Sequence, residues 1–476
     1  MRWYRRPWTI GLALTSGVLT FVIGGSHLAA QAPPLSSGMT PGDVTFYEAS
    51  PKLFAGPKGE TLRLSYRSTS PGTGGTIVAT PFASGWQPLV EIMPEDKDVT
   101  AGIPDLALGP AGQLTVAYQW WRKLPTSSKQ IRVARSNDGG KTWVQPATPL
   151  DTSGKAFTPK AAWGSDGNLV VVWADEQRSN RVWDVYARHS ADGGATWESE
   201  RLLSRFPQHT PTDAYVRPEL ISDGAKRFWA VWVGIRSARS RVFLNRSTDG
   251  GHTWTDPFEV SGQSESVYNH RIVRSGDHLL IVWQDKRTGR ERLYAVSSAD
   301  GGITWTPPTR VDHLSDDLRT DAFAMTTTMS PDREVLVAWN DGRNGRDDIF
   351  VGRSADGGRT WDDKDIRLDT DEAGTAMSRF PAMARAVNGR IAVAWEDDRA
   401  GYEGVYVRIR SAGPQPQWGP EILVEGPSQR KGARQASVIW AADGALQVAW
   451  EVWDYTAGPL APTRGIDSRK LALDKK

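Results

Sequence analysis

Cysteine is absent from the 476 residues of this chain, which excludes disulfide bonds, thiolate nucleophiles and cysteine-based zinc sites. Histidine is scarce, and its seven copies are scattered without the spacing of a metal site. The segment Asp369-Thr370-Asp371-Glu372 has the composition of a calcium loop, but a solvated turn is the favoured interpretation. The sequence therefore predicts neither a metal ion nor another cofactor.

A strong excess of one charge is also lacking once the N-terminal segment is set aside. Residues 1–32 contain three arginines and no acidic residue, so the rest of the chain has 54 basic and 55 acidic residues. This balance argues against nucleic acid or an anionic membrane surface as the main partner. With 39% hydrophobic residues and 22 tryptophans, the chain has ample material for a large core.

Residues 1–32 have the three parts of a secretory signal. These parts are a basic region, an apolar stretch and a cleavage site, at Arg2 to Arg6, residues 9–25 and Ala30-Gln31-Ala32. Two alternatives stay open: an uncleaved anchor, although the apolar stretch is short for a span, and a twin-arginine signal at Arg5-Arg6, although Pro7 follows. We expect an exported protein, periplasmic or extracellular, whose mature chain has no membrane span.

One eight-residue pattern recurs along the chain at nearly constant spacing. Five intact copies have the form S-x-D-G-G-x-T-W and lie at residues 136–143, 190–197, 247–254, 298–305 and 354–361. Two degenerate copies end at Trp86 and Trp418, and the seven tryptophans are 51 to 57 residues apart. Self-similarity at this period is typical of a fold built from repeated supersecondary units.

An apolar run that ends in an aromatic residue is a second periodic mark. Eight such aromatics occur 51 to 59 residues apart, at Tyr66, Tyr118, Trp173, Trp232, Trp283, Trp339, Trp395 and Trp450. Runs such as LVVVW at residues 169–173 are predicted as strands buried on both faces. Proline stands about fourteen residues before the aromatic in five units, at Pro51, Pro104, Pro159, Pro218 and Pro381, where we expect it to open a strand.

Each unit is therefore predicted to contain four antiparallel strands. Strand A opens near the proline, B is the apolar run, C leads into the repeated pattern, and a short D follows its tryptophan. Alternation in C, as at residues 184–188, predicts a more exposed strand. Four strands every fifty-odd residues are typical of a β-propeller blade. We expect an all-β propeller with eight blades, with seven as the alternative, whereas six fits poorly.

The predicted propeller spans residues 51–456. Its last unit has strands A and B between Arg434 and Trp450 but no copy of the repeated pattern, so ring closure is expected to need another strand. Residues 33–50 form a linker with a candidate ring-closing strand at Val44–Glu48, predicted to pair into the last blade. Residues 457–476 are a tail or a further strand of that blade.

The pattern S-x-D-G-G-x-T-W resembles the Asp box, or bacterial neuraminidase repeat, of sialidases across most of residues 51–456. The Asp side chain is expected to accept hydrogen bonds within its turn, the Gly pair to permit positive φ, and Trp to pack between blades. A motif present in most blades serves the fold rather than a site. The resemblance implies that the boxes lie opposite the active site, which is then expected among the B–C and D–A loops.

The B–C loops carry a second motif, Trp-x-Asp-x-Arg. It supplies the pairs Asp285–Arg287, Asp341–Arg343 and Asp397–Arg399, with Asp175 and Arg178 as a looser copy. Pairing of each Asp with its Arg, which closes the loop, is the favoured interpretation. The alternative is a polar rim that binds a hydroxylated or anionic ligand.

Sialidases resembling this chain bind a sugar carboxylate with three arginines, attack with a tyrosine activated by a glutamate, and protonate the leaving group with an aspartate. One of these arginines lies in a Phe-Arg-Ile-Pro motif. Its nearest match is Ser378-Arg379-Phe380-Pro381, although this lies in the seventh unit rather than an early one. Arg434 has the equivalent place in the next unit, so the two arginines can fork onto one carboxylate. Arg217 and Arg271 are further ligand-binding candidates, out of register.

The B–C loops near these arginines supply Asp397, Asp398, Tyr402, Glu451, Asp454 and Tyr455. The candidate acid is Asp397 or Asp398, and the candidate nucleophile is Tyr402 or Tyr455. The favoured function is binding of a glycan, or of an envelope or extracellular protein, through the loop rim. The alternative is an exo-acting glycosidase of the sialidase type that removes terminal acidic sugars. The sequence leaves the oligomeric state open.

Overall fold

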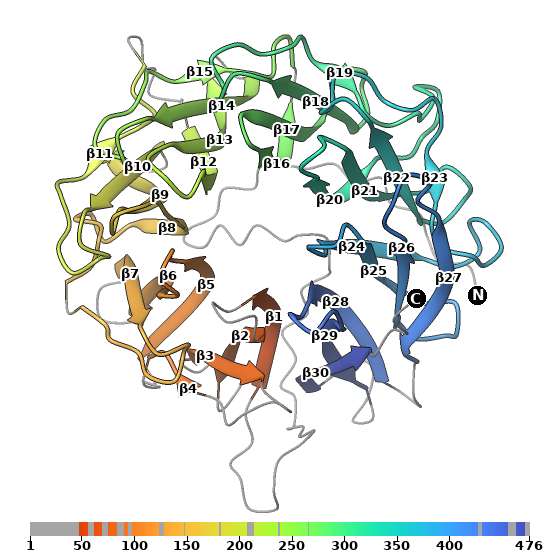
Figure 1. Ribbon diagram of the computed structural model, residues 1–476, viewed down its shortest axis with the longest axis horizontal. Coiled ribbons are helices and arrows are strands. Elements are labelled where there is room, and N and C mark those ends of the chain that lie inside the picture. The colour runs from red at the N-terminus through yellow and green to blue at the C-terminus, as the bar shows by residue number, and fades with distance from the viewer. Residues whose placement is uncertain are drawn as a thin grey trace, which may run out of the picture.

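The structure is a computed structural model that describes residues 47–471, with internal gaps at 56–60, 69–74, 83–89, 94–97, 123–127, 147, 180–181, 207–213, 237–238, 265, 427–430 and 456–462. The expected signal at residues 1–32 lies outside this range. Every regular element of the described residues is a β-strand, and the sheets are arranged in a ring (Figure 1). Within the same residues, no helix has the length and apolar character needed to cross a membrane.

The first four blades follow one another in chain order. Blade 1 contains β1 (Tyr47–Ala55), β2 (Thr61–Ser68), β3 (Gly75–Phe82) and β4 (Val90–Glu91). Blade 2 contains β5 (Val99–Leu108), β6 (Leu114–Arg122), β7 (Ser128–Ser136) and an outer bridge between Arg135 and Val144. Blade 3 contains β8 (Ala156–Trp163), β9 (Leu169–Ser179), β10 (Val182–Ser190) and β11 (Arg201–Leu202). Blade 4 contains β12 (Ala214–Ser222), β13 (Phe228–Arg236), β14 (Arg239–Ser247) and β15 (Phe258–Glu259).

The other four blades complete the ring. Blade 5 contains β16 (Val267–Ser275), β17 (His278–Asp285), β18 (Arg292–Ser298) and β19 (Thr309–Arg310). Blade 6 contains β20 (Phe323–Met329), β21 (Val335–Asp341), β22 (Asp348–Ser354) and β23 (Ile366–Arg367). Blade 7 contains β24 (Ser378–Arg385), β25 (Ile391–Asp397), β26 (Gly404–Arg410) and β27 (Trp418–Glu425). Blade 8 has three strands in the described residues, β28 (Lys431–Trp440), β29 (Leu446–Asp454) and β30 (Thr463–Leu471). The prediction of an all-β, eight-bladed propeller is confirmed.

The apolar B strands are buried on both faces, as their composition predicts. In β17, Leu279, Ile281 and Trp283 pack toward blade 4, whereas Leu280 and Val282 pack toward blade 6. The alternation follows from the two-residue period of a strand, and each fully buried side chain of this kind stabilises the fold by about 1.5–3 kcal/mol. Seven of the eight predicted aromatics are at most 1% exposed, namely Tyr118, Trp173, Trp232, Trp283, Trp339, Trp395 and Trp450.

Strand C is less exposed than its alternation predicted. In β10, the four residues Asp184, Val185, Tyr186 and Ala187 are all buried. The carboxylate of Asp184 tolerates this position because the hydroxyl of Ser204 donates a 2.7 Å hydrogen bond to it. Polar residues in this strand therefore reflect local hydrogen bonds rather than contact with water.

The five intact boxes have a common hydrogen-bonded turn. In blade 3 the hydroxyls of Ser190 and Thr196 donate to Asp192, at 2.8 and 2.6 Å, and the Thr196 N–H donates to the same carboxylate at 2.8 Å. The two glycines that follow Asp192 have positive φ. Close packing also requires glycine in the next blade, because a Cβ at Gly251 would lie 2.4 Å from the side chain of Val170 in blade 3. The structural role predicted for the box is thus visible in its geometry.

Each strand A contains a β-bulge, and the predicted prolines lie in it. Pro104, Pro159, Pro218 and Pro381 stand inside the register shifts of β5, β8, β12 and β24, not at the first residue of a strand as expected. A bulged residue makes no ladder hydrogen bond, so the missing N–H of proline is tolerated in mid-strand. The residue before each of these prolines has positive φ, between 50 and 55°.

Ring closure also differs from the expectation. Tyr47 and Glu48, the described part of the candidate closing strand, pair with Ser68 and Arg67 of β2. The other residues of that segment, 44–46, lie outside the described residues. Because β2 takes its backbone hydrogen bonds, β1 belongs to blade 1 and does not extend the last blade.

The seam between the last and the first blade is formed by packing. Strand β1 contacts β28, β29 and β30, which lie beside it in the ring (Figure 1). Among the described residues, the N–H of Leu53 donates a 3.1 Å hydrogen bond across the seam to the hydroxyl of Ser437. Strand β30 pairs with β29 over its full length, so residues 463–471 supply the third strand of blade 8.

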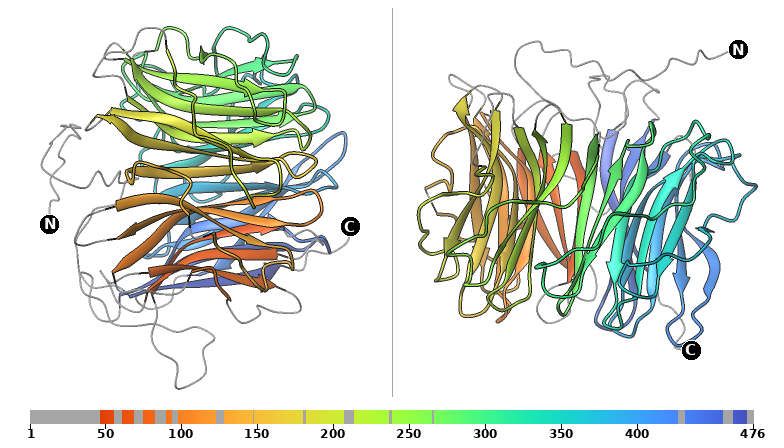
Figure 2. Two further views of the ribbon diagram at one scale, coloured as in Figure 1. Left: turned by 90° about the vertical axis from the view of Figure 1, so that its left-hand side faces the viewer. Right: turned by 90° about the horizontal axis from the view of Figure 1, so that it is seen from above.

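The strands run between two faces of the ring, as the side view shows (Figure 2). Ser298 begins a box and pairs with Leu279 at the start of strand B, whereas Arg292 pairs with Asp285 at the end of strand B. The boxes and the A–B turns therefore share one face, here called the box face. The B–C and D–A loops share the opposite one, here called the loop face.

Candidate functional site

The Trp-x-Asp-x-Arg motif forms an Asp–Arg pair over an aromatic ring of strand C in three blades. In blade 5 the indole N–H of Trp283 donates to Asp285 at 2.9 Å, and Arg287 donates to the same carboxylate at 2.6 Å. The guanidinium also lies over the ring of Tyr294 in strand C, 4.1 Å from its centre. Corresponding pairs are Asp341–Arg343 over Phe350 and Asp397–Arg399 over Tyr406. Each motif thus closes its own B–C loop, and these arginines are engaged within the protein.

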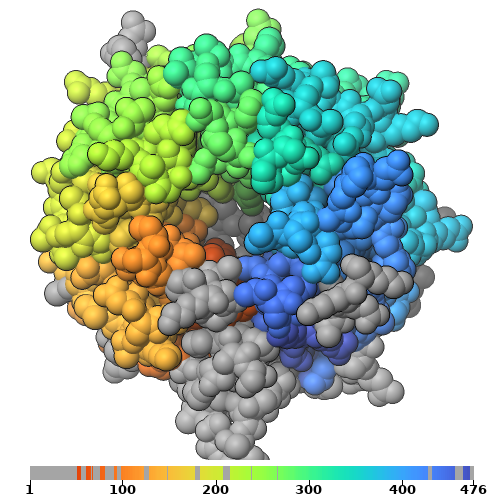
Figure 3. All heavy atoms as spheres, in the orientation of Figure 1, coloured from red at the N-terminus to blue at the C-terminus, as the bar shows by residue number. Residues whose placement is uncertain are grey.

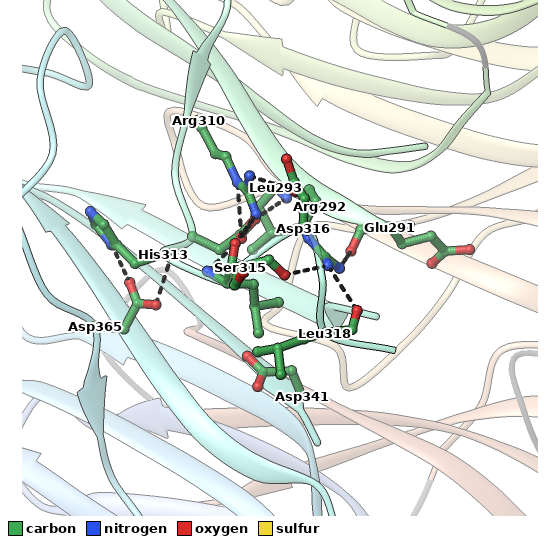
Figure 4. Close-up of polar contacts among 12 residues, drawn as sticks. Glu291, Arg292, Leu293, Arg310, His313, Ser315, Asp316, Leu318, Asp341 and Asp365 are labelled. Carbon is green, nitrogen blue, oxygen red and sulfur yellow. Dashed lines mark hydrogen bonds and ion pairs between the residues drawn. The ribbon is translucent and has the colours of Figure 1, made fainter. Parts of the chain in front are cut away.

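A fully buried arginine holds a D–A loop on the same face. Arg292 donates hydrogen bonds of 2.7 to 3.2 Å to four backbone carbonyl oxygens, those of Glu291, Ser315, Leu318 and Thr320 (Figure 4). Close by, Asp365 accepts hydrogen bonds from His313 and from Arg343, each at 2.8 Å. The loop face of blades 5 and 6 is therefore cross-linked by its own charged groups.

The acidic segment considered as a calcium loop surrounds an arginine instead. Asp369 and Asp371 lie with Asp348 close enough together to hold a cation. The guanidinium of Arg367 contacts all three carboxylates, at 3.0 Å from Asp348 and 2.7 Å from Asp371. Burial, with the charge of Asp348, raises the pKa of Asp369 to about 8. Arg367 supplies the positive charge that this cluster requires.

The bulges of strand A place alternating charges around half of the central channel. Five equivalent positions in blades 1 to 5 are Lys52, Asp105, Lys160, Glu219 and Arg271. Lys160 lies 3.1 Å from Asp105, and Arg271 lies 3.1 Å from Glu219. The space-filling view shows the ring hollowed at its centre (Figure 3). Four of them, Lys52, Lys160, Glu219 and Arg271, line a pocket in which cations outnumber carboxylates.

Two of the predicted ligand-binding arginines, Arg217 and Arg271, belong to this pocket. Arg217 donates a 2.8 Å hydrogen bond to Asn269 of the next blade. Burial lowers the pKa of Arg217, and the charge of Arg271 lowers it further. Burial also lowers the pKa of neighbouring His270 to about 4, so this imidazole is neutral at pH 7. The pocket lies in blades 1 to 5, apart from Arg379 and Arg434 in blades 7 and 8.

Arg379 and Arg434 occupy equivalent places, as the repeat predicted. Each precedes the bulge of its strand A, where Arg379 is opposite Glu396 and Arg434 is opposite Glu451. The guanidinium of Arg379 lies 3.6 Å from the Glu396 carboxylate, and that of Arg434 contacts Glu403 directly. Both arginines are about 30% exposed, which leaves part of each guanidinium accessible from the loop face.

The carboxyl group of Glu396 lies between these groups and is 2% exposed. It accepts a 3.1 Å hydrogen bond from the N–H of Gln435 in blade 8. Burial raises its pKa to about 7, although the nearby charges of Arg379 and Arg434 oppose this. Such a carboxyl group is present in both protonation states near neutral pH.

Aromatic rings complete this part of the loop face. Tyr402 and Tyr455 stack with their ring centres 5.7 Å apart, and Trp453 lies 6.4 Å from Tyr455. The guanidinium of Arg434 lies over Trp453 at 4.7 Å. We call the set Arg379, Glu396, Tyr402, Glu403, Arg434, Trp453 and Tyr455 the blade 7–8 corner. It brings together the two arginines and the two tyrosines singled out in the sequence.

Comparison with known proteins agrees with the repeat. The profile of the family described as "BNR repeat-like domain" matches residues 76–313, half of the chain. The chain belongs to this BNR repeat-like family. The BNR-repeat chain is 23% identical over 318 residues to xyloglucanase Xgh74A of Acetivibrio thermocellus, which covers 60% of this chain and 35% of the xyloglucanase. It is 28% identical over 218 residues to a sialidase of Bacteroides fragilis, with 40% of this chain and 36% of the sialidase covered.

The BNR-repeat chain thus spans about a third of the length of these two relatives. Among solved structures, the intramolecular trans-sialidase of a leech has a TM-score of 0.40 at 13% identity, with 93% of this chain and 94% of that chain covered.

Two candidate residues of this BNR-repeat chain lie beside the corner rather than in it. Asp397 accepts hydrogen bonds from the hydroxyl of Ser378 at 2.7 Å and from Arg399. Burial opposes its ionisation, but the hydrogen bonds from Arg399 and Ser378 outweigh burial and lower its pKa. Asp398 accepts hydrogen bonds from the N–H of Met377 at 2.8 Å and from Arg346 at 2.7 Å.

Sequence reasoning missed the two glutamates of the corner. Glu396 follows the aromatic of strand B, and the same position in the two preceding blades holds the amides Gln284 and Asn340. Asn340 makes the matching contact, because it accepts a 3.3 Å hydrogen bond from the N–H of Phe380 in the next blade. The change from amide to carboxylate at this position was the available signal. No such signal marked Glu403, because it lies in a loop whose residues have no equivalent positions in the other repeats.

Proposed function

We propose that this protein binds a glycan at the blade 7–8 corner. The observation that carries the proposal is the convergence there of stacked aromatic rings with two arginines and two carboxyl groups on one rim. Aromatic faces pack against the apolar faces of sugar rings, and paired guanidinium and carboxylate groups offer donors and acceptors for hydroxyls. The similarity to a xyloglucanase and a sialidase supports a glycan as the ligand class.

The charges of the corner bear on which glycan is bound. Each arginine already faces a carboxyl group, Arg379 that of Glu396 and Arg434 that of Glu403. An acidic sugar therefore gains a full counter-charge only at Arg379, where Glu396 can take up a proton because its pKa is about 7. Neutral sugars need no counter-charge, so their binding does not require a protonated Glu396. We expect neutral oligosaccharides to bind with little pH dependence and sialylated ones to bind more tightly below pH 7.

Glycan hydrolysis is the second candidate function, and Glu396 is the observation that favours it. A carboxyl group with a pKa near 7 is suited to donate a proton to a leaving group. Glu403, in direct contact with the guanidinium of Arg434, is placed to assist as a base or to stabilise positive charge. Tyr455 lies near enough to Arg434 to interact with its charge, so it remains a candidate nucleophile of the sialidase type. Export to the periplasm or the extracellular space, where such glycans occur, is part of this proposal.

Binding and turnover are tested with two probes, a xyloglucan heptasaccharide and 3′-sialyllactose. Isothermal titration calorimetry of the wild type should give one site, and Tyr402→Ala should weaken it at least about 10-fold through the lost ring contact. Arg379→Lys should weaken the binding of 3′-sialyllactose and leave the binding of the neutral probe unchanged. Lysine keeps the positive charge but cannot donate two parallel hydrogen bonds to a carboxylate. Arg287→Lys is the matched control, an arginine stacked on a tyrosine of the same face outside the corner.

The outcomes separate the functions. Release of sugar from either probe, abolished in Glu396→Gln and retained in Arg287→Lys, establishes hydrolysis. Binding without release leaves a lectin-like propeller. If neither probe binds, or if Tyr402→Ala and Arg287→Lys bind alike, the corner is not a glycan site, and an extracellular protein becomes the partner to test.

A further inference from the structure

Three residues that depart from the repeat meet at one place on the box face. His189 stands immediately before the box of blade 3, Glu198 follows the tryptophan of that box, and His252 lies inside the box of blade 4. In the other intact boxes the position of His189 is held by Arg135, Arg246, Ser297 and Arg353, and that of His252 by Lys141, Ala195, Ile303 and Arg359. Repeat structure alone therefore does not account for this combination.

The three side chains face one another across the junction of two blades. Glu198 Oε1 lies 2.9 Å from His252 Nδ1 and 3.4 Å from His189 Nδ1. One nitrogen or oxygen from each residue lies within 4.8 Å of the other two. The imidazole rings are 4.0 Å apart and tilted by 52°, so they are not stacked face to face. The backbone N–H of Glu198 donates to the carbonyl of His189 at 2.9 Å, which fixes these two residues side by side.

Asn168 determines which nitrogen of His189 faces the cluster. The side-chain amide of Asn168 donates to the carbonyl of Ser165 at 2.7 Å, so its oxygen is the atom that faces His189 Nε2, at 2.8 Å. An amide oxygen only accepts, so Nε2 carries the hydrogen and Nδ1 is the nitrogen with the free lone pair. That Nδ1 atom belongs to a side chain only 1% exposed, and it has no hydrogen-bond partner.

We propose that His189, Glu198 and His252 bind one divalent transition-metal ion, with zinc preferred. Two imidazole nitrogens and one carboxylate oxygen form a common ligand set of zinc, and the chain contains no cysteine that would compete for it. Zinc ligands about 2.0–2.1 Å from the metal are separated by about 3.4 Å in a tetrahedron. The 3.4 Å distance from Glu198 to His189 agrees with this value, and the 2.9 Å distance to His252 is shorter, so a small side-chain movement brings the three atoms into place.

The surroundings suit an ion of this kind. The hydrogen bond from His189 Nε2 to Asn168 is the contact that usually orients a metal-binding imidazole. On the solvent side, His252 and Glu198 are 44% and 39% exposed, which leaves a fourth position for water. Arg201 also approaches Glu198, but it lies 3.9 Å from the other carboxylate oxygen. The metal would join strand β10 of blade 3 to the box of blade 4.

The test uses tag-free protein of full length stripped with a chelator and titrated with ZnCl₂. We expect one zinc per chain by calorimetry, a higher melting temperature with zinc, and visible absorption typical of four-coordinate Co²⁺ when cobalt replaces zinc. His252→Ala and Glu198→Gln change partly exposed side chains and should preserve the fold, while each lowers zinc affinity more than about 100-fold, beyond the loss typical of an outer-shell change. His278→Ala, at an A–B turn elsewhere on the box face, is the matched control.

The proposal is overturned if stripped wild-type protein binds no zinc at ligand concentrations of about 100 µM, a weak limit for three protein ligands. It is equally overturned if His252→Ala and His278→Ala bind zinc alike, because binding would then be adventitious. Loss of both the calorimetric site and the cobalt spectrum in His252→Ala and in Glu198→Gln but not in His278→Ala, with an unchanged melting temperature in the absence of metal, supports it.

Discussion

Glu334 accepts hydrogen bonds from both terminal nitrogens of Arg410, at 2.7 and 2.9 Å, although 76 residues separate the two in the chain. Glu334 lies just before strand B of blade 6, and Arg410 is the last residue of strand C of blade 7, so the pair joins neighbouring blades. Arg353 and Arg385 also reach this carboxylate, at 2.8 and 3.4 Å. One acidic side chain thus compensates three guanidinium groups on the box face.

Replacing Glu334 with Gln should destabilise the ring, because three arginines lose their shared counter-charge. Partial exposure moderates the effect, so we expect a loss of about 1–3 kcal/mol in urea unfolding at pH 7. Burial opposes ionisation of Glu334, but the hydrogen bonds from Arg410 and Arg353 lower its pKa to about 2. Because its pKa is lower in the folded state, Glu334 stabilises the fold at pH values above its pKa in the unfolded chain, near 4.5. This added stability is lost as the pH falls toward 2. The difference between wild type and variant should therefore shrink over that interval, whereas Glu372→Gln, at an exposed position, should change nothing.

The box aspartates should contribute to stability in the same pH window. Hydrogen bonds from the hydroxyl and N–H of Thr196 lower the pKa of Asp192 to about 2. Asp192→Ala removes these bonds in one blade, and because the turn is solvent-exposed we expect a loss of only about 1 kcal/mol at pH 7, falling to none near pH 2. Chemical denaturation at pH 7, 4 and 2.5 measures this. An equal loss for Asp363→Ala, an exposed aspartate outside any box, would contradict the prediction.

Glu396 should give stability the opposite pH dependence. Its pKa is raised by burial to about 7, so the folded state holds this proton more tightly than the unfolded state does. Stability from this group is therefore present below about pH 4.5 and falls as pH rises through about 7. Glu396→Gln keeps an oxygen to accept the hydrogen bond from Gln435, as Asn340 does for Phe380, and removes the titration. Melting curves from pH 5 to 8 should show a smaller decline for the variant. Parallel curves would mean that Glu396 is ionised throughout.

The box tryptophans should act through packing alone. Trp254 is partly buried and packs on the core shared by blades 3 and 4, and its indole N–H donates to Gly251 at 3.1 Å. Trp254→Ala should cost about 3 kcal/mol, less than Trp232→Ala in the same core, whose ring is fully buried. Glycan affinity of the folded fraction should stay unchanged, since the box face lies opposite the corner. Lost binding with unchanged unfolding would assign the box a role in the site.

The repeat made the fold predictable, because blade number follows from counting buried aromatics in B strands. Trp173 and its equivalents mark a strand that is covered on both sides by neighbouring blades, so their pattern survives where boxes degenerate. Ring closure was less predictable. A short segment such as Val44–Glu48 has the same strand propensity in either terminal blade, and its partner depends on hydrogen bonds between segments far apart in sequence.

The site was predictable only where it follows the repeat. Arg379 and Arg434 share a register position, so their equivalent placement in strand A was expected, and in the structure each stands just before the bulge of that strand. The stack of Tyr402 on Tyr455 joins loops of two different blades, and the repeat pattern of the sequence does not predict it. The choice between Asp397 and Glu396 depended on side-chain direction at the end of a strand. Successive residues there point to opposite faces, so adjacent carboxylates have opposite environments.

The seam between β28–β30 and β1 is expected to be the weakest junction between neighbouring blades of the ring. Other neighbouring blades are joined by a continuous chain, whereas in the part of the chain that the structure describes this pair of blades is held by packing and the Leu53–Ser437 hydrogen bond. Tension applied between residues 47 and 471 would therefore act on this junction first and open the disc into an arc of blades. A circular permutant that links these two positions and opens the chain at another interblade loop moves the weak junction around the ring without altering any blade.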